Sequence, residues 1–194
     1  AVLYGDLLMT LRNQCKPYEI DIGASDELAN SWALRLAEEM RQKGCLNYKK
    51  IKKNYQNIVR DFAKLPRTTE EKIKIGIVGE IYVKFSPLGN NNLEDFLIAE
   101  GAEPVMPGLL DFCLYCVVNN IKDTELYGMH KLRGFGADVL YKWLLKKQRD
   151  IIDAIKENSN FKPMSPFDHT CTLPQGYIDM GMKMGEGWLL TSEM

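Results

Sequence analysis

An alternation of apolar runs and short helices across residues 73–107 most constrains what this chain can fold into. Residues 73–78 form a β-branched apolar run, a helix is expected over about 93–100, and a second short run occupies 102–107. An apolar helix is expected directly afterwards. Strands that alternate with helices indicate βαβ units, which build parallel sheets. The nearly continuous apolar character of the first run predicts a strand that is covered on both faces.

The remaining sequence divides into three segments. Residues 1–66 are predicted to be helical, 67–71 form a polar linker, and 72–194 are predicted to be an α/β segment. This last segment includes a long helix at about 137–157 and an irregular tail at 158–184. We therefore expect a helix-rich α/β fold with a small, mainly parallel sheet, similar to half of a Rossmann-like or flavodoxin-like domain. Because the chain begins without methionine and ends inside an expected helix, we expect a fragment of a larger domain, truncated at both ends.

Capping residues and apolar spacing predict the helix ends and their buried faces. Ser25 is the expected N-cap of the second helix and Gly44 its stop, the third helix is expected from about Asn47, and Gly101 is expected to cap the helix after the first strand. The side chains expected to face inward at helical spacing are Leu28, Trp32, Leu36 and Met40; Ile51, Tyr55, Ile58, Val59 and Phe62; Leu93, Phe96 and Leu97; and Leu140, Trp143, Leu144, Ile151 and Ile155.

The loop "GEIYVKFSPLGNNN" follows the first predicted strand and carries the first group of candidate site residues. They are Glu80, Lys84, Asn90, Asn91 and Asn92. In open α/β sheets, ligands bind at the carboxyl ends of the strands, and free amides at a helix start can bind a phosphate or a carboxylate. One interpretation is therefore a polar pocket floor. The other is a turn in which one asparagine caps the next helix and the two charged side chains are solvated.

The turn "GEGW" supplies the second group of candidates, Gly185, Glu186 and Trp188. Glycine allows close approach of the backbone to a ligand or to another segment. Glu186 is interpreted either as a partner of the helix dipole or as a site residue. We expect this turn and the loop at 79–92 to form one pocket rim. Standard nucleotide phosphate-binding loops, G-x-x-x-x-G-K-[ST] and G-x-G-x-x-G, are absent from the sequence.

The five cysteines do not suggest a disulfide framework, because their number is odd and the chain is long enough for an apolar core. Cys113 and Cys116 form a C-x-x-C pair, which is typical of a redox site or of iron–sulfur ligands. The apolar neighbours in "LLDFCLYCVV" favour the other interpretation, two buried and reduced thiols. His169 beside Cys171 is a weak zinc signal. We therefore expect no firm metal site, no cofactor and no ATPase activity in this chain.

Composition excludes several classes of protein. With a net charge of −1, no large electrostatic field argues for binding to nucleic acid or to an anionic membrane. No apolar run approaches the roughly 20 residues that span a bilayer, and the N-terminus lacks the basic-then-apolar plan of a secretory signal. A cytoplasmic location is expected, with neither nucleic acid nor membrane as a partner.

Three stretches resemble one known family. They are "KIGIVGEIYVKFSPLGNNNLEDFLIAEGAEPVMPGLLDFCLYC" within residues 72–116, "DLLMTLRNQCKPYE" at Asp6–Glu19 and "GEGWLLTSEM" at Gly185–Met194. The family is the 2-hydroxyacyl-CoA dehydratase-related segment of large CoA-substrate-specific enzyme activases, the activators of 2-hydroxyglutaryl-CoA dehydratase. The likeness spans nearly the whole chain, in the same order. The cluster cysteines of the dehydratase subunits do not match the cysteines of this chain residue by residue.

The resemblance implies a function for a longer parent protein. Such a protein would carry an ATPase domain and a [4Fe-4S] cluster, and ATP hydrolysis would drive an electron onto a dehydratase partner that removes water from a 2-hydroxyacyl-CoA by radical chemistry. In this chain, the loop at 79–92 and "GEGW" would line a cavity for acyl-CoA or a cluster. The alternatives are a non-catalytic module that docks other domains of the parent chain, and an anion-binding α/β domain of unrelated function.

Overall fold

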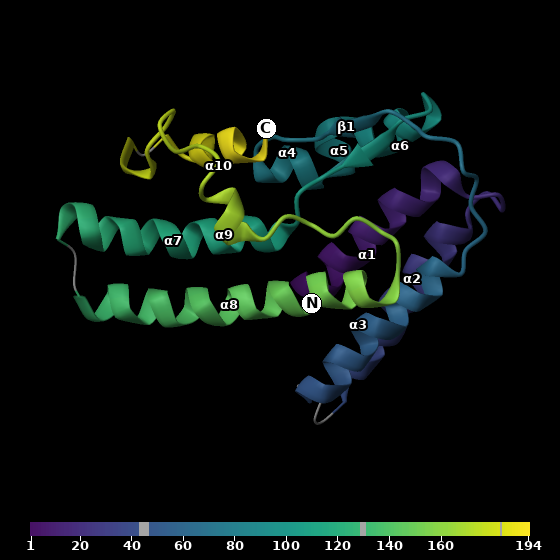
Figure 1. The fold of residues 1–194 in the computed structure, drawn as a ribbon, viewed down its shortest axis with the longest axis horizontal. Helices are drawn as coiled ribbons and strands as arrows, with labels where there is room; N and C mark the ends of the chain where they lie inside the picture. Colours follow the sequence, from purple (N-terminus) through teal and green to yellow (C-terminus); the bar gives the residue numbers. More distant parts are fainter. Residues whose placement is uncertain (43–46, 129–130, 183) are drawn as a thin grey trace.

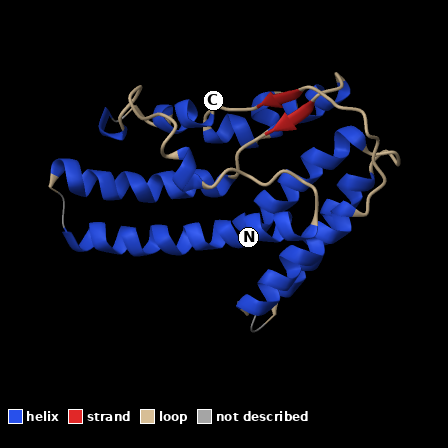
Figure 2. Cartoon of the chain, viewed as in Figure 1, coloured by secondary structure: helices blue, strands red, loops and turns tan. Residues whose placement is uncertain are grey.

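A computed structural model describes residues 1–42, 47–128, 131–182 and 184–194 of the 194-residue chain. Helices dominate it, and two short strands lie at one side (Figure 2). The helices are α1 (Val2–Cys15), α2 (Ala24–Arg41), α3 (Tyr48–Ala63), α4 (Ile81–Phe85), α5 (Pro87–Asn90), α6 (Leu93–Ala99), α7 (Leu109–Tyr127), α8 (Lys131–Asn158), α9 (Phe167–Thr170) and α10 (Gly187–Glu193). Two 3₁₀ turns, η1 (Lys16–Tyr18) and η2 (Met180–Met182), and the strands β1 (Lys74–Gly76) and β2 (Glu103–Val105) complete it.

The sheet consists of β1 and β2, which pair in parallel with Lys74 opposite Glu103 and Gly76 opposite Val105. The chain between them runs through α4, α5 and α6 (Figure 1). The predicted helix-rich fold with a small parallel sheet is thus confirmed. The predicted covering of the first strand on both faces is wrong, because all three residues of β1 are exposed. In the described part of the chain, α1 and α6 pack mainly on β2, so the residues of β1 are left exposed.

Two apolar cores hold the helices together. The first joins α1, α2 and α3 to the C-terminal half of α8, where Ile151 and Ile155 are fully buried. The second joins α7 and the middle of α8 to α9, η2 and α10. In Figure 1, α7 and α8 run side by side as a long hairpin, and α1 to α3 lie against one end of it. The first core therefore draws on residues from both sides of the predicted linker at 67–71.

The ends of α2 differ from the sequence prediction. Gly23 is its N-cap, and Ser25 is a buried residue of its first turn. The carboxylate of Glu19 caps the helix instead, because it accepts bonds from the amides of Gly23 (2.6 Å) and Ser25 (2.9 Å). The helix ends at Arg41, and the predicted stop at Gly44 lies outside the described residues.

Other predicted helix ends are confirmed. The Asn47 side chain accepts bonds from two first-turn amides of α3, those of Lys49 (3.1 Å) and Lys50 (3.3 Å). Gly101 follows α6 with a positive φ of 84°, which suits the residue after a helix C-terminus.

Four predictions of buried apolar side chains on helices are wrong. Met40 near the end of α2 is exposed, and so is Phe96 on α6, because α6 packs on the sheet from one side only. Leu140 and Trp143 are exposed on α8, which begins at Lys131 and is longer than predicted. Within the described residues, no helix combines the length and the apolar composition that a membrane span needs.

Candidate functional site

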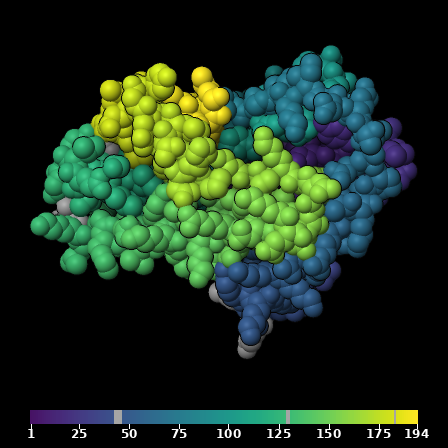
Figure 3. Space-filling model, viewed as in Figure 1, coloured from purple at the N-terminus to yellow at the C-terminus, as the bar shows by residue number. Residues whose placement is uncertain are grey.

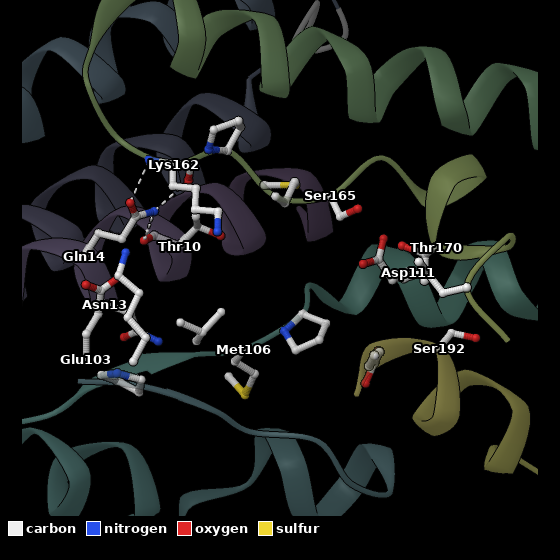
Figure 4. A pocket seen from close by; sticks show the side chains of 18 residues that line it. Thr10, Asn13, Gln14, Glu103, Met106, Asp111, Lys162, Ser165, Thr170 and Ser192 are labelled. Carbon is white, nitrogen blue, oxygen red and sulfur yellow. Dashed lines mark hydrogen bonds and ion pairs between the residues drawn. The ribbon is translucent and has the colours of Figure 1, made fainter. Parts of the chain in front are cut away.

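A cavity of about 300 Å³ lies at the carboxyl end of β2 (Figure 4). This is where open α/β sheets place their ligands, and the volume is at the lower end of the range for small-molecule pockets. Its walls come from α1, both strands, the residues after β2, the first turn of α7, the segment 162–165, α9 and the residues after it, and α10. The lining residues are Thr10, Asn13, Gln14, Lys74, Glu103, Pro104, Val105, Met106, Pro107, Asp111, Lys162, Pro163, Met164, Ser165, Thr170, Leu173, Ser192 and Glu193.

Three polar side chains gather at one end of the cavity: Asp111 from α7, Thr170 from α9 and Ser192 from α10 (Figure 4). All three residues are buried. The two hydroxyls donate to main-chain oxygens four residues earlier, Ser192 to Trp188 within α10 at 2.8 Å and Thr170 to Pro166, the N-cap of α9, at 3.4 Å. Their oxygens can still accept a bond from a bound molecule. This end of the cavity therefore offers one carboxyl group between two hydroxyls.

Burial is the main reason that the pKa of the Asp111 carboxyl is raised. Loss of solvent raises the pKa of this carboxyl to about 7, and the nearby carboxylates of Asp6 and Glu193 act in the same direction. A bond of 2.7 Å from the side-chain amide of Gln148 partly opposes the rise. Gln148 is fixed in turn, because its oxygen accepts the amide of Phe167 at 2.8 Å. A carboxyl poised near neutral pH in a cavity is suited to proton exchange with a ligand.

Asp6 joins α1 to the wall of the cavity. Its two carboxylate oxygens accept the amides of Leu109 and Leu110, both at 2.9 Å, and so satisfy the start of α7. A Cβ atom on Gly108 would lie 2.6 Å from a carboxylate oxygen of Asp6, so only glycine fits there without a shift. This contact fixes the helix that carries Asp111.

Replacing Asp6 with alanine should destabilise the protein by about 1–3 kcal/mol, because two buried amides would lose their acceptor. Asp6→Asn keeps one acceptor oxygen and should lose less. The free energy of unfolding from urea titration measures both effects. Asp138→Ala, on an exposed turn of α8, is the control. A loss for Asp6→Ala no larger than for this control would contradict the capping role.

A buried ion pair lies behind the cavity wall. The ammonium of Lys84 contacts both carboxylate oxygens of Glu193, at 2.9 and 3.1 Å, and the two side chains are only 3% and 2% exposed. Burial raises the pKa of Glu193, although the bond to Lys84 opposes the rise. The pair ties α4 to α10, so the position of Glu193 in the cavity depends on the loop after β1.

The opposite end of the cavity carries basic and amide groups. Gln14 pairs with the main chain of Lys162, accepting its amide at 2.8 Å and donating to its carbonyl at 2.9 Å. This pairing holds the segment 162–165 over α1 (Figure 4). Lys74 pairs with the buried carboxylate of Glu103 at 3.3 Å, and Glu103 also accepts a bond from the hydroxyl of Tyr18 at 2.7 Å.

The residues predicted from the first loop have structural contacts. Glu80 caps α4, accepting the amides of Tyr82 (2.9 Å) and Val83 (3.1 Å), and Lys84 forms the ion pair described above. Asn90 accepts the amide of Leu93 at 3.2 Å, so the predicted asparagine cap of α6 is confirmed. Asn91 and Asn92 are exposed residues of the turn before α6, with positive φ angles of 56° and 55°.

The residues predicted from "GEGW" meet that loop. A carboxylate oxygen of Glu186 accepts the amide of Ile81 at 3.1 Å, one residue after Glu80. The carbonyl of Gly185 accepts a bond from the hydroxyl of Tyr115, whose ring stacks on buried Trp188 at 5.9 Å. The two segments thus come together where α4 and α10 begin. Among the described residues that line the cavity, none belongs to the eight predicted candidates.

The four described cysteines are free thiols. Cys113 and Cys116 are free thiols of intermediate burial, which agrees with the expectation of mostly buried, reduced side chains. Burial raises the pKa of both thiols, and it raises the pKa of Cys15 to about 12 and of Cys171 to about 11. Within the described ranges, no group of three or more Cys, His, Asp or Glu side chains could hold a metal ion.

Sequence reasoning missed the residues at the polar end of the cavity. Asp111 is the one acidic side chain in "GLLDFCLYCVV", and an acid inside an apolar helix is a signal for a capped or functional position. Thr170, Ser192 and Glu193 belong to short helices in weakly patterned sequence, where no local signal distinguishes them.

Comparison with models of protein families, with curated proteins and with solved structures finds no match to this chain.

Proposed function

We propose that this chain is the ligand-binding part of a 2-hydroxyacyl-CoA dehydratase-like or activase-type protein of the cytoplasm, and that its cavity receives the acyl end of a 2-hydroxyacyl thioester. One observation carries the proposal: the carboxyl of Asp111, with a pKa of about 7, lies in a cavity at the carboxyl end of a parallel strand. The likeness of three sequence stretches to that family supports the choice of ligand.

The size and charge of the cavity restrict the class of ligand that it can bind. About 300 Å³ holds a short acyl chain but not the nucleotide of coenzyme A, which would remain outside. Asp111 places an ionisable carboxyl at the inner end, and this favours an uncharged acyl chain over a dicarboxylic one. Lys74 and Lys162 at the other end suit the anionic phosphate groups of the coenzyme A part of the ligand.

The residues of this chain would bind the acyl group and exchange a proton with it. Neutral Asp111 can donate to the hydroxyl or the carbonyl oxygen, and ionised Asp111 can accept a proton. Ser192 and Thr170 would accept bonds from the ligand hydroxyl and so orient it. Electron transfer driven by ATP and a [4Fe-4S] cluster would belong to other domains of the parent chain or to its dehydratase partner.

Titration calorimetry with 2-hydroxybutyryl-CoA tests this function. We expect saturable binding that Asp111→Asn weakens about tenfold or more. The reason is that a buried hydrogen bond to a charged group contributes about 1.5–3 kcal/mol. Binding to the unchanged chain should depend on pH between about 6 and 8, and binding to the variant should not.

Two controls decide the result. Asp138→Asn, an exposed acid paired with Lys142, should bind as the unchanged chain does. Free coenzyme A should bind more weakly than the thioester, because it lacks the acyl group. Equal affinity of Asp111→Asn and the unchanged chain, or equal affinity for coenzyme A alone, would contradict the proposal.

A second candidate is a docking module, and the sheet favours it. Parallel sheets normally have both faces covered, yet Ile73, Ile75 and Val105 are exposed along the two strands. Other domains of the same parent chain would cover these side chains. Absence of any thioester binding in the calorimetry experiment would favour this role over the first.

A further inference from the structure

The first half of α8 carries a row of exposed apolar side chains. Leu132, Phe135, Val139 and Trp143 are spaced by three or four residues, so they share one face of the helix. Leu132 is 87% exposed, Phe135 70% and Trp143 54%. Single exposed apolar residues are ordinary, but a contiguous row on one helix face marks an interaction site. We call these four residues the α8 stripe.

The opposite face of α8 is already occupied. A Cβ atom on Gly134 would lie 2.8 Å from the Thr124 side chain of α7, so the two helices approach closely there. In Figure 1, α7 runs along one side of α8, and among the described elements α3 meets α8 only near its C-terminal half. The space-filling view shows the first half of α8 at the outer margin of the molecule (Figure 3). The α8 stripe is thus an uncovered face of a helix held on its other side.

The row continues into the contact with α3. Lys147 and Asp150 follow Trp143 by four and seven residues, and both contact Tyr48 in the first turn of α3. The ammonium of Lys147 lies 3.3 Å from the centre of the Tyr48 ring and 5.3 Å from that of Trp143. Beyond this point α3, an amphipathic helix, packs on α8 through the first core. One end of this row therefore already receives a helix.

Charge around the stripe indicates the chemistry of the occupant. Residues 131–147 contain five basic side chains and one acidic side chain, a net charge of +4, whereas the whole chain has a net charge of −1. The one acid, Asp138, pairs with Lys142 at 2.6 Å. The Arg133 guanidinium donates to the side-chain oxygen of Asn120 on α7 at 2.6 Å. Among the described residues, Lys131 and Lys146 have no ion-pair partner. An occupant with acidic flanks would neutralise them, whereas a second copy of the same face would bring another charge of +4.

We propose that the α8 stripe docks an amphipathic helix of a protein partner, with an apolar face toward the stripe and acidic side chains along both of its edges. The stripe spans about 17 Å, or three turns of helix. Its spacing matches the anchors of a helix laid against an apolar groove. This surface lies on the far side of α8 from α7, which carries Asp111, so the proposal stands independently of the ligand of the cavity.

A fluorescein-labelled helical peptide of about sixteen residues is the probe, with leucines at i, i+4, i+7 and i+11, glutamates on both flanks and alanine elsewhere. We expect saturable binding to the chain by fluorescence anisotropy. Phe135→Ser combined with Val139→Ser should weaken it about tenfold or more. Both side chains are exposed, so the fold should persist, and far-UV circular dichroism checks this. Leu88→Ser, an exposed apolar position on α5, is the matched control and should bind as the unchanged chain does.

A second set of measurements tests whether the charge of the peptide affects its binding to the α8 stripe. A peptide with lysines in place of the glutamates should bind about tenfold more weakly, and raising salt from about 50 to 500 mM should weaken only the acidic peptide. The proposal is overturned by equal affinity of both peptides, or by binding that the double serine variant leaves unchanged. It is also overturned by stripe-dependent co-sedimentation with phosphatidylserine vesicles in the absence of peptide binding, or by self-association that the variant abolishes.

Discussion

Lys84→Met is expected to destabilise the protein by about 3–5 kcal/mol, as measured by the free energy of unfolding in urea. Removing one member of a buried ion pair leaves the other charge without a partner in a poorly solvated place. Here the remaining group is Glu193, whose side chain is 2% exposed and contacts Lys84 through both oxygens. The loss should be smaller at pH 5 than at pH 8. Burial already raises the pKa of Glu193, so low pH allows this carboxyl to become neutral.

Two further variants separate the loss of a charge from the loss of packing. In Lys84→Met with Glu193→Leu, no charge is left uncompensated, and most of the stability should return. Lys122→Met removes an exposed partner of Glu125, where a change of about 0–1 kcal/mol is expected. If the double variant is as unstable as Lys84→Met, the buried charge is not the cause of the loss.

The sequence predicted the elements better than their environments. Asn47 and the apolar positions of α3 specify that helix locally, since a capping side chain and a 3.6-residue period suffice. The β-branched run before Gly79 specifies a strand, but the covering of that strand depends on which elements reach it. The exposure of β1 follows from the packing of α1 and α6 on β2, which no property of the residues of β1 determines.

At the candidate site, the difference between what local sequence predicts and what depends on tertiary packing is larger. Glu80 and Asn90 cap helices that begin within a few residues of them, so local spacing predicted polar roles for both. The cavity instead depends on contacts between distant segments. Asp111 on α7 meets Gln148 on α8, and the fields of Asp6 on α1 and Glu193 on α10 act on it. Only the packing of four helices brings these groups together, and single-sequence patterns contain no information on that packing.

The titration of Asp111 should make the stability of the fold fall as pH rises from 5 to 8. The carboxyl has a pKa of about 7 in the folded protein, above its usual 3.8, so the folded state holds this proton more tightly than the unfolded state does. The stabilisation is complete below the unfolded pKa and is lost as pH rises through about 7. Two pH units between 5 and 7 correspond to about 2–3 kcal/mol.

Asp111→Asn isolates this effect. An asparagine still accepts the bond from Gln148 but does not titrate, so the stability of the unchanged protein relative to the variant should fall by about 2–3 kcal/mol from pH 5 to pH 8. Other acids titrate in both proteins, and their contributions largely cancel in the difference. Asp138→Asn, at a partly exposed acid of α8, is the control variant. A difference for Asp111→Asn that does not change with pH would mean that this carboxyl is ionised throughout the range, which removes the observation on which the proposed ligand site rests.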